Sequence, residues 1–493
     1  MMSRRVFFYD DQDLETRHGL HLAYGPVRKL GLVQWPRPEW DLERASVFAG
    51  SVVELPGGGY RLYYSGRCPG GEGTFGIALA ESEDGIEWTK PLLGQLEVGG
   101  ADTNRIAIEG MPPEGSCTQP QVVLTPDGSW LMWSWWHAHD AGYMRYVLAE
   151  SEDGVRWRVT DVNRPAVMHP ADCELGQNAW VAGLTGASAE DRFAHQRTME
   201  WMEAKRLRSN DATYVYYNED AGRFEMYSVW LLPVDEATHR VTPHDNAPRV
   251  LRTIHRREST DAVTWSDPEM LILADEHDPL HQELYYLAVQ PDGGWNIGML
   301  GHYRCWEQTM DLELCFSRDT HAWVRPLRGG WVPRGEIDEI DYMSIYAANR
   351  LLDMGDRWRL LYRGGNAKHN HELPEGVDEA RQETFVAEAP KGRFAGLSTT
   401  NRAIGALTLS RFNHTGERIT VHADVRGRLQ AELRDPYGRP LPGFELNSCA
   451  PIAGDAQEHV LTWEGGKTSA EYRYDVVGLR VEMEDGVLYS IET

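Results

Sequence analysis

Short runs in which apolar and polar residues alternate fill the chain from residue 51 onward, and Gly-rich turns separate them. The first set of runs occupies residues 51–55, 60–64 and 76–80. Runs of this length with a period of two predict β-strands, and the short turn at residues 56–59 predicts antiparallel neighbours. A short segment that carries a tryptophan ends the set. The pattern therefore predicts one four-stranded antiparallel unit.

The segment that ends the set is a repeated motif, S-x-D-x-x-x-W. Its four copies run from Ser82 to Trp88, from Ser151 to Trp157, from Ser259 to Trp265 and from Ser317 to Trp323. The aspartate can hydrogen-bond the backbone just beyond it and start a tight turn, in which the glycine of the first two copies tolerates positive φ. The tryptophan offers a large flat surface that can fill a wedge between packed sheets. Internal repetition of one such unit predicts a repeat architecture.

Four more units follow the first. They are predicted from residues 121–124, 130–133 and 144–148, from 213–217 and 223–227, from 284–289, 295–299 and 312–316, and from 344–346 and 358–362. Five such units predict a five-bladed β-propeller over residues 41–393. Residues 160–210 are its largest insertion, with a helical pattern at 187–208. Residues 1–40 are predicted to form an N-terminal arm that packs on the propeller or closes it.

The pattern changes character at about residue 394. Alternating runs typical of half-buried strands occupy residues 406–409, 419–425, 429–433, 460–463 and 479–483. They predict a second all-β domain over residues 394–493, most simply a β-sandwich. This domain offers few candidate catalytic groups, so we expect it to serve packing or binding. The predicted fold class is all-β, a five-bladed propeller followed by a sandwich.

The charge of the chain narrows its partners. Its 493 residues include 49 Lys and Arg against 75 Asp and Glu, a net charge of −26. Nucleic acid and anionic membranes need a cationic footprint, so neither is an expected partner, while a homo-oligomer is left open. The N-terminal residues lack the apolar run of a signal peptide, and the six cysteines lack metal-ligand spacing. We therefore expect a cytoplasmic protein with reduced thiols and no cofactor, and a metal site formed by His369, His371 and nearby acids is left open as an alternative.

The Y-R-L-Y-Y run at residues 60–64 and the S-x-D-G-x-x-W segments resemble those of the five-bladed propeller glycosidases of glycoside hydrolase families 32 and 43. The chain is more specifically similar to uncharacterised bacterial relatives of family 32 with a C-terminal β-sandwich. Residues 438–444, 449–455 and 488–490 carry that second similarity. The resemblance covers nearly the whole chain from residue 41 and implies a bacterial glycosidase with its site in the central pocket.

Hydrolysis of a glycosidic bond generally needs two carboxyl groups, one that protonates the leaving oxygen and one that attacks the anomeric carbon or activates water. In the resembled families these acids begin the innermost strand of a blade. The first two units have no acid there, offering Ala49 and Gln119 instead. The later units offer Asp211, Glu283 and Asp341, which we predict to converge on one hollow. Glu283 is assigned as the acid and Asp211 as the base or nucleophile, and Asp341 would orient substrate or tune its neighbours.

Other residues near these strand starts are predicted to bind substrate. Aromatic faces after the middle strand of the second unit suit stacking on sugar rings. A His-rich loop follows the middle strand of the fifth unit. The predicted binding residues are Gln119, Trp136, His137, Arg363, His369 and His371.

The function that these residues favour is hydrolysis of a small glycoside or oligosaccharide. The N-terminal arm and the long insertion would narrow the pocket and favour exo-action. A propeller phosphorylase remains open, because Arg197, Arg206, Arg208 and His369 could hold phosphate. A non-catalytic carbohydrate-binding propeller also remains open, because the first two units lack their acids. Phosphate dependence separates the first two alternatives, and any turnover separates both from the third.

Overall fold

The computed structural model describes residues 4–69, 74–111, 115–138, 143–160, 208–233, 250–400, 403–416 and 418–493. Across these ranges the chain is nearly all-β, with three short 3-10 helices and no α-helix. Within the same ranges, no helix is long and apolar enough to span a membrane. The predicted helical pattern at residues 187–208, and nearly all of the insertion that contains it, lie outside the described residues.

The first three predicted units are separate sheets, antiparallel throughout except that β11 pairs with β15 in parallel. The first has the order β10-β7-β6-β5, the second β11-β15-β14-β13-β12 and the third β16-β17-β18-β19. Their strands are β5 (Glu43–Glu54), β6 (Tyr60–Arg67), β7 (Phe75–Ser82), β10 (Arg105–Ile106), β11 (Ile108–Glu109), β12 (Ser116–Leu124), β13 (Trp130–Ala138), β14 (Tyr143–Ser151), β15 (Trp157–Val159), β16 (Arg208–Asn218), β17 (Arg223–Pro233), β18 (Val250–Ser259) and β19 (Glu269–Ile272). β8 (Glu97–Val98) and β9 (Ala101–Asp102) pair with each other between the first two sheets in sequence.

The fourth and fifth units share one sheet, because Met310 pairs in parallel with Ser344. The fourth unit has the order β20-β21-β22-β23, and the fifth has β24-β26-β27-β4, with β25 on β26. These strands are β20 (Gln282–Asp292), β21 (Trp295–Arg304), β22 (Thr309–Ser317), β23 (Trp323–Val324), β24 (Ser344–Ala347), β25 (Leu352–Asp353), β26 (Arg357–Gly365), β27 (Gln382–Pro390) and β4 (Arg28–Leu32). The N-terminal strand β4 thus completes the last unit.

The first strands of the five units lie against one another. Between the first and second units, Ser51 Oγ donates to the carbonyl of Pro120 at 2.9 Å. Between the third and fifth units, Tyr214 Oη donates to the carbonyl of Ala347 at 2.8 Å. Between the fifth and first units, the backbone N–H of Val52 donates to a side chain that follows β24. These side-chain bonds satisfy polar groups where the sheets meet.

Each copy of the S-x-D-x-x-x-W motif makes the same hydrogen bonds. In the first copy, Ser82 Oγ lies 3.2 Å from Asp84 Oδ1. Asp84 Oδ1 also accepts from the backbone N–H of Ile86 at 2.8 Å and of Glu87 at 2.9 Å. Asp153, Asp261 and Asp319 repeat both backbone bonds in the other three copies. The motif is therefore a turn whose geometry the aspartate fixes.

The residue after each of these aspartates has positive φ. Gly85 and Gly154 both have φ of 72°. Ala262 and Thr320 take the same conformation, with φ of 66° and 67°. A residue with a Cβ adopts this region at a cost, so the hydrogen bonds of the motif outweigh the strain in the two degenerate copies.

The four motif tryptophans pack between neighbouring units. Trp88 is 2% exposed and Trp157 is 3% exposed, which confirms the prediction of burial for these two. Trp265 and Trp323 are half-buried. The ring of Trp157 lies edge-on to that of Tyr63 in the preceding unit, with centroids 6.1 Å apart. The motif turn thus delivers a wedge of aromatic surface to the unit before it.

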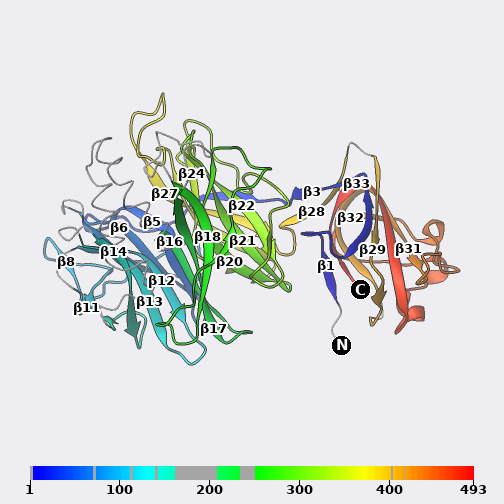
Figure 1. Cartoon of the computed structure of the whole chain (residues 1–493), viewed down its shortest axis with the longest axis horizontal. Coiled ribbons are helices and arrows are strands. Elements are labelled where there is room, and N and C mark those ends of the chain that lie inside the picture. The colour runs from blue at the N-terminus through cyan, green and yellow to red at the C-terminus, as the bar shows by residue number, and fades with distance from the viewer. Residues whose placement is uncertain are drawn as a thin grey trace.

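The C-terminal strands form one curved nine-stranded sheet rather than two separate sheets, to the right in Figure 1. Its strands are β28 (Ala395–Thr399), β29 (Ile404–Leu409), β30 (Phe412–Asn413), β31 (Thr420–Arg434), β32 (Ile452–Val460) and β33 (Val476–Glu492), with β1 (Arg5–Phe7), β2 (Leu14–His18) and β3 (Leu20–Tyr24) from the N-terminus. Residues 419–425 and 429–433, predicted as two strands, belong to the single strand β31, which a register shift interrupts. The strand predicted at residues 460–463 is wrong, because β32 ends at Val460 and Trp463 turns into the core.

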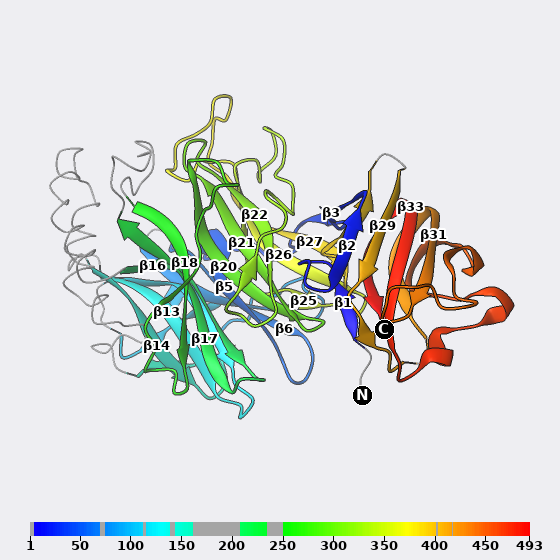
Figure 2. The ribbon, with the colours of Figure 1, turned by 45° about the vertical axis from the view of Figure 1, so that its right-hand side comes forward.

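The N-terminal residues 1–40, predicted as an arm of the propeller, divide between both parts of the molecule. Figure 2 shows β1, β2 and β3 in blue beside the orange and red strands of the C-terminal sheet. Two chain segments therefore connect the parts, and they run together, since the backbone N–H of Gly25 donates to the carbonyl of Phe394 at 2.9 Å. Tyr9 stacks on Phe316 of the fourth unit with ring centroids 4.0 Å apart. The two parts thus share buried aromatic contacts.

Replacing Gly154 by alanine should destabilise the protein more than the same change at Gly128. Both glycines have positive φ, which costs an alanine about 1–2 kcal/mol. A Cβ on Gly154 would also lie 2.8 Å from Tyr63 Oη and 2.9 Å from Trp130, whereas one on Gly128 would meet nothing within 4 Å. Overpacking adds roughly 1–3 kcal/mol to the loss at Gly154. Urea denaturation of both variants measures the difference in the free energy of unfolding. Equal losses of stability would show that Tyr63 and Trp130 do not pack tightly against Gly154.

Asp261 should contribute a stability that depends on pH. Backbone N–H donors of Thr264 and Val263 lower the pKa of Asp261 from its ordinary 3.8 to about 2. A carboxyl whose pKa falls on folding stabilises the protein above the unfolded pKa and loses this contribution as the pH falls through the folded pKa. Asp261→Asn should therefore be less stable than the wild type at pH 6, and the gap should narrow between about pH 4 and pH 2. Asp220→Asn, in an exposed turn, controls for general loss of charge in the denaturation series.

Candidate active site

The first strands of the units carry irregularities near one end. Their pairing registers shift between Ser46 and Ser51, Thr118 and Gln121, Ser209 and Thr213, and Leu284 and Leu287. Ala49, Gln119 and Ala212 lie within three of these shifts and have positive φ of 47°, 55° and 53°. Bulges of this kind re-aim side chains and are frequent beside active sites. They place three predicted site residues, Gln119, Asp211 and Glu283, at or beside a bulge.

Gln119 joins the second unit to the carboxylate of the third. Its Nε2 donates to Asp211 Oδ2 at 3.2 Å, and its Oε1 accepts from the backbone N–H of Ala212 at 2.9 Å. The amide therefore bridges β12 to β16 and orients the half-buried carboxylate of Asp211. Gln119 occupies the position at which the resembled families have an acid. Here it hydrogen-bonds the carboxylate of Asp211 instead.

Glu283 forms an ion pair with an arginine that the sequence did not single out. Arg252 Nη1 lies 2.6 Å from Glu283 Oε2, and the backbone N–H of Arg252 donates to the same oxygen at 3.2 Å. Glu283 is 8% exposed and Arg252 is 1% exposed. Both contacts stabilise the charged form of the carboxylate.

Aromatic side chains join these carboxylates to the loop after β26. Tyr346 Oη lies 3.0 Å from His369 Nδ1. The rings of Tyr285 and Tyr303 pack on His369 with centroids 4.9 and 4.6 Å away, and the guanidinium of Arg252 lies over both tyrosines. We call the group of Gln119, Asp211, Arg252, Glu283, Tyr285, Tyr303, Tyr346, Arg363 and His369 the strand-end cluster.

Electrostatics tie Asp211 to the same group. Burial raises the pKa of Tyr346 above its ordinary value, and Arg363 opposes that shift. Asp211 also raises the pKa of Tyr346 and Arg252 lowers it, so both charges act on one phenol. Asp211 therefore acts on the same phenol as Arg252, the arginine that pairs with Glu283.

Arg363 lies over the ring of Tyr346, and His371 is close enough to Arg363 for their charges to interact. The guanidinium carbon of Arg363 is 4.6 Å from the centre of the Tyr346 ring. Burial lowers the pKa of Arg363, and so does the positive charge of Arg44. The pKa of His371 is likewise lowered, first by burial and then by Arg363 and Arg44. Arg44 and Arg363 therefore bring positive charge to this part of the strand-end cluster, and their charge favours the neutral form of His371.

Asp341 has other partners. Lys29 Nζ lies 2.7 Å from its Oδ2, and Tyr362 Oη donates to the same oxygen at 2.9 Å. Asp341 is 3% exposed, and burial followed by this carboxylate raises the pKa of Tyr362. Its contacts thus join the fifth unit to the N-terminal strand β4, whereas Asp211 and Glu283 contact the strand-end cluster.

Trp136 is 3% exposed and packs with Val147 and Val159 in a small apolar core. His137 lies on β13, and its side chain is outside the described part of the structure. The sequence reading missed Arg252 because it left β18 unassigned. A signal was present, since the third strand of the first, second and fourth units ends at the serine of its motif. The same offset from Ser259 would have placed Arg252 on a strand.

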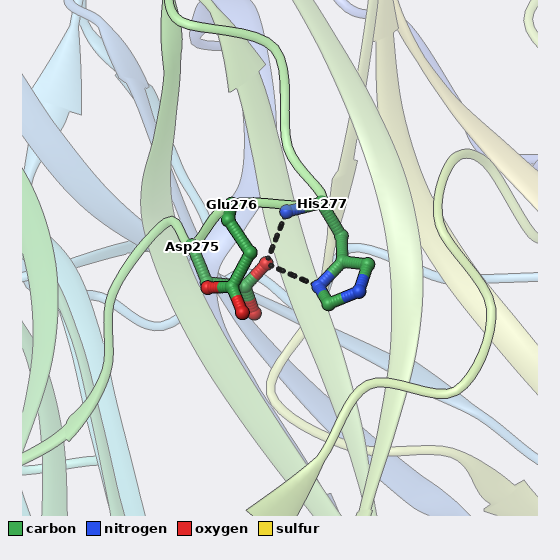
Figure 3. Close-up of side chains that lie close together, drawn as sticks. All are labelled: Asp275, Glu276 and His277. Carbon is green, nitrogen blue, oxygen red and sulfur yellow. Dashed lines mark hydrogen bonds and ion pairs between the residues drawn. The ribbon is translucent and has the colours of Figure 1, made fainter.

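Among the described residues, one group of three acids and histidines has metal-ligand spacing. It comprises Asp275, Glu276 and His277, all exposed (Figure 3). The dashed lines join Asp275 Oδ1 to the backbone N–H of His277 at 2.9 Å and to its Nδ1 at 3.4 Å. Arg328 also pairs with Asp275 at 2.8 Å. Hydrogen bonds within a surface turn account for this arrangement.

No family model matches the chain, and no curated protein sequence matches it; no family model therefore supports the finer resemblance to the family 32 relatives. Solved structures do match. A glycoside hydrolase has 12% identity and a TM-score of 0.46 over 74% of this chain and 92% of its own. An N-acetylgalactosamine deacetylase from F. plautii, in complex with blood group B trisaccharide, has 16% identity and a TM-score of 0.45 over 76% and 96%. A thermostable family-43 glycoside hydrolase has 12% identity and a TM-score of 0.40 over 70% and 89%.

Replacing Asp341 by asparagine should lower the free energy of unfolding by about 1–3 kcal/mol, because Lys29 and Tyr362 each lose a buried ionised acceptor. Lys29→Met should cost less, since the Lys29 side chain is 28% exposed. A double-mutant cycle from urea denaturation isolates the interaction between the two residues. A coupling energy near zero would show that this ion pair does not hold β4 to the fifth unit.

Proposed function

We propose that the chain is a glycoside hydrolase that cleaves a small glycoside or oligosaccharide. The observation that supports this proposal is the placement of Asp211 and Glu283 at the bulged ends of neighbouring first strands, around one group of tyrosines. Two carboxyl groups are what glycosidic cleavage requires. The phenol and imidazole groups beside them offer the hydrogen bonds and flat faces that sugar hydroxyls and ring faces need.

The five sheets would then be the blades of a five-bladed β-propeller. The contacts among first strands support this architecture, and so does the repeated turn that sets a tryptophan against the preceding unit. In such a ring the first strands line the centre, and their ends share one rim. The curved C-terminal sheet would pack against this ring as a sandwich-like domain.

The ion pair with Arg252 favours exchanging the roles that the sequence suggested. A carboxylate held at 2.6 Å by a buried guanidinium is stabilised in its charged form, which suits a base or nucleophile. Glu283 therefore takes that role. Asp211 becomes the proton donor, with Gln119 orienting its carboxyl group. Asp341 remains a candidate for positioning through Tyr362, which adjoins the core of the fifth unit.

The exo-action expected from the sequence rests on the insertion at residues 160–210, so it stays a proposal from the sequence. The N-terminal arm no longer supports it, because β1, β2 and β3 belong to the C-terminal sheet. A second candidate, a propeller phosphorylase, is favoured by one observation. Arg363, whose pKa Arg44 lowers, places positive charge beside Tyr346, the phenol on which Asp211 also acts.

Asp211→Asn and Glu283→Gln should each lower kcat by about 10²–10⁴-fold with the fold intact, because each removes one partner of the proton-transfer chemistry. The pH dependence of kcat/KM should separate the roles. Loss of the base removes the limb in which activity rises with pH, and loss of the acid removes the limb in which activity falls. Residual activity of Glu283→Gln should therefore lack the acidic limb, and that of Asp211→Asn should lack the alkaline limb.

The measurement is release of reducing sugar from a panel of aryl glycosides and oligosaccharides. Asp220→Asn is the matched control for Asp211, because Asp220 lies in the exposed turn just beyond the other end of β16. Full activity of both amide variants on a substrate that the wild type cleaves would remove the proposal. Interchanged pH limbs would restore the assignment that the sequence suggested.

A further inference from the structure

Among the described residues, Arg363 lacks the acidic partner that four buried arginines of the same sheets have. Those four pair with a glutamate at 2.5–2.7 Å: Arg252 with Glu283, Arg256 with Glu225, Arg325 with Glu313 and Arg359 with Glu388. Within the described part of the chain, Arg363 has no ion pair, and its Nε is buried without a hydrogen-bond partner. Its guanidinium lies over the ring of Tyr346 and also hydrogen-bonds that side chain. A half-buried guanidinium left in this state costs stability unless a ligand completes it.

The surroundings of Arg363 add positive charge to it. Arg44 lowers the pKa of both Arg363 and His371, and Arg363 lowers the pKa of His371. Neither of the two proposed acids forms an ion pair with Arg363 among the described residues. Glu283 pairs with Arg252. Asp211 raises the pKa of the Tyr346 phenol, which Arg363 lowers. The chain has a net charge of −26, so most of its surface repels anions. The two guanidinium groups of Arg363 and Arg44 would attract an anionic group to this one place.

We propose that Arg363, flanked by Arg44 and His371, binds an oxyanion, either the carboxylate of an acidic sugar or a phosphate group. This rests on the proposed function, because it places the anion beside Asp211 and Glu283. The guanidinium presents a planar fork of donors that matches carboxylate and phosphate oxygens. Stacking on Tyr346 fixes the plane of that fork before the ligand arrives, which reduces the entropy lost on binding.

The two sources of the oxyanion have different consequences. A carboxylate on the substrate would make the protein selective for uronic acid residues over neutral sugars of the same shape. A free phosphate would be a co-substrate, as in the phosphorylase alternative. In both cases the same guanidinium binds the same kind of oxygen, so one set of variants tests both.

The experiment is isothermal titration calorimetry of the full chain with inorganic phosphate, glucuronate and galacturonate, with glucose and galactose as neutral matches. We expect saturable binding of at least one anion and a weaker response to the neutral sugars. Arg363→Gln should weaken that binding by about 10- to 100-fold, the range expected for charge-assisted hydrogen bonds. Arg44→Gln, an exposed change that spares the core, should weaken it by a smaller factor of about 2–5.

Arg350→Gln is the matched control. Arg350 also lies over a tyrosine ring, that of Tyr216 at 5.8 Å, and burial likewise lowers its pKa. Tyr216 is five residues along β16 from Asp211, about 16 Å away at the rise of a strand. Removing Arg350 should therefore leave anion binding unchanged. Asp211→Asn should lose turnover and keep anion binding, so failure of the proposed function and failure of the anion site give different results.

Binding of phosphate alone would identify a co-substrate, and binding of the uronates would identify an acidic sugar; either supports the site. Three results would overturn it. They are absence of saturable binding of every anion at or below about 10 mM, binding that Arg363→Gln leaves unchanged in a variant with wild-type circular dichroism, and equal weakening by Arg350→Gln.

Discussion

The hydrogen bonds from two backbone N–H groups to one aspartate oxygen, made in all four copies of the repeated motif, set the geometry on which the larger part of the chain depends. They hold the next residue at positive φ even where that residue is alanine or threonine. The turn they fix sends the tryptophan four residues on toward the preceding unit, where Trp88 and Trp157 are fully enclosed. Because each unit relies on its neighbour for this contact, no unit buries its apolar faces alone.

The candidate site depends on that packing through the first strands. Side-chain bonds from Ser51 and Tyr214 hold these strands to one another. Gln119 and Asp211 lie within bulges that turn them out of the regular pleat, and Glu283 lies beside a bulge at the same end. Regular strands that pack together hold side chains in fixed positions, and bulges at their ends change the direction in which those side chains point. Such an arrangement suits catalytic groups.

Buried charge is arranged in two ways in these sheets. Arg256, Arg325 and Arg359 pair with glutamates, whereas Arg350 lies over the ring of Tyr216. At the strand-end cluster one arginine, Arg252, is neutralised by Glu283, while Arg363 stacks on a tyrosine. The ion pair with Arg252 favours the charged form of Glu283, whereas Arg363 has no such pair among the described residues. Two arginines of the strand-end cluster thus differ in their partners. Arg252 pairs with a carboxylate, and Arg363 lies over an aromatic ring.

Much of the local structure follows from the sequence by itself. Period-two alternation and Gly-rich turns predicted strands that the structure contains in the five units, and the S-x-D-x-x-x-W spacing predicted the turn and its tryptophan. These features are readable because their causes are local: a side chain that bonds the backbone two and three residues on, and a pleat that repeats every two residues. The choice of Gln119, Asp211, Glu283, Arg363 and His369 also came from position relative to a strand, which is local information.

Only the tertiary structure decided which distant residues meet. Lys29 reaches Asp341 across 312 positions of sequence, and Arg28 to Leu32 complete the last unit from the other end of the chain. The pairing of Glu283 with Arg252 and the contact of Tyr346 with His369 likewise join different strands and loops. Nothing in the spacing of such residues encodes their contact, because it arises from the way sheets pack. The sequence by itself therefore determined the strands, the turns and the candidate acids. Tertiary packing decided that Glu283 pairs with Arg252 and that Arg363 lies over Tyr346.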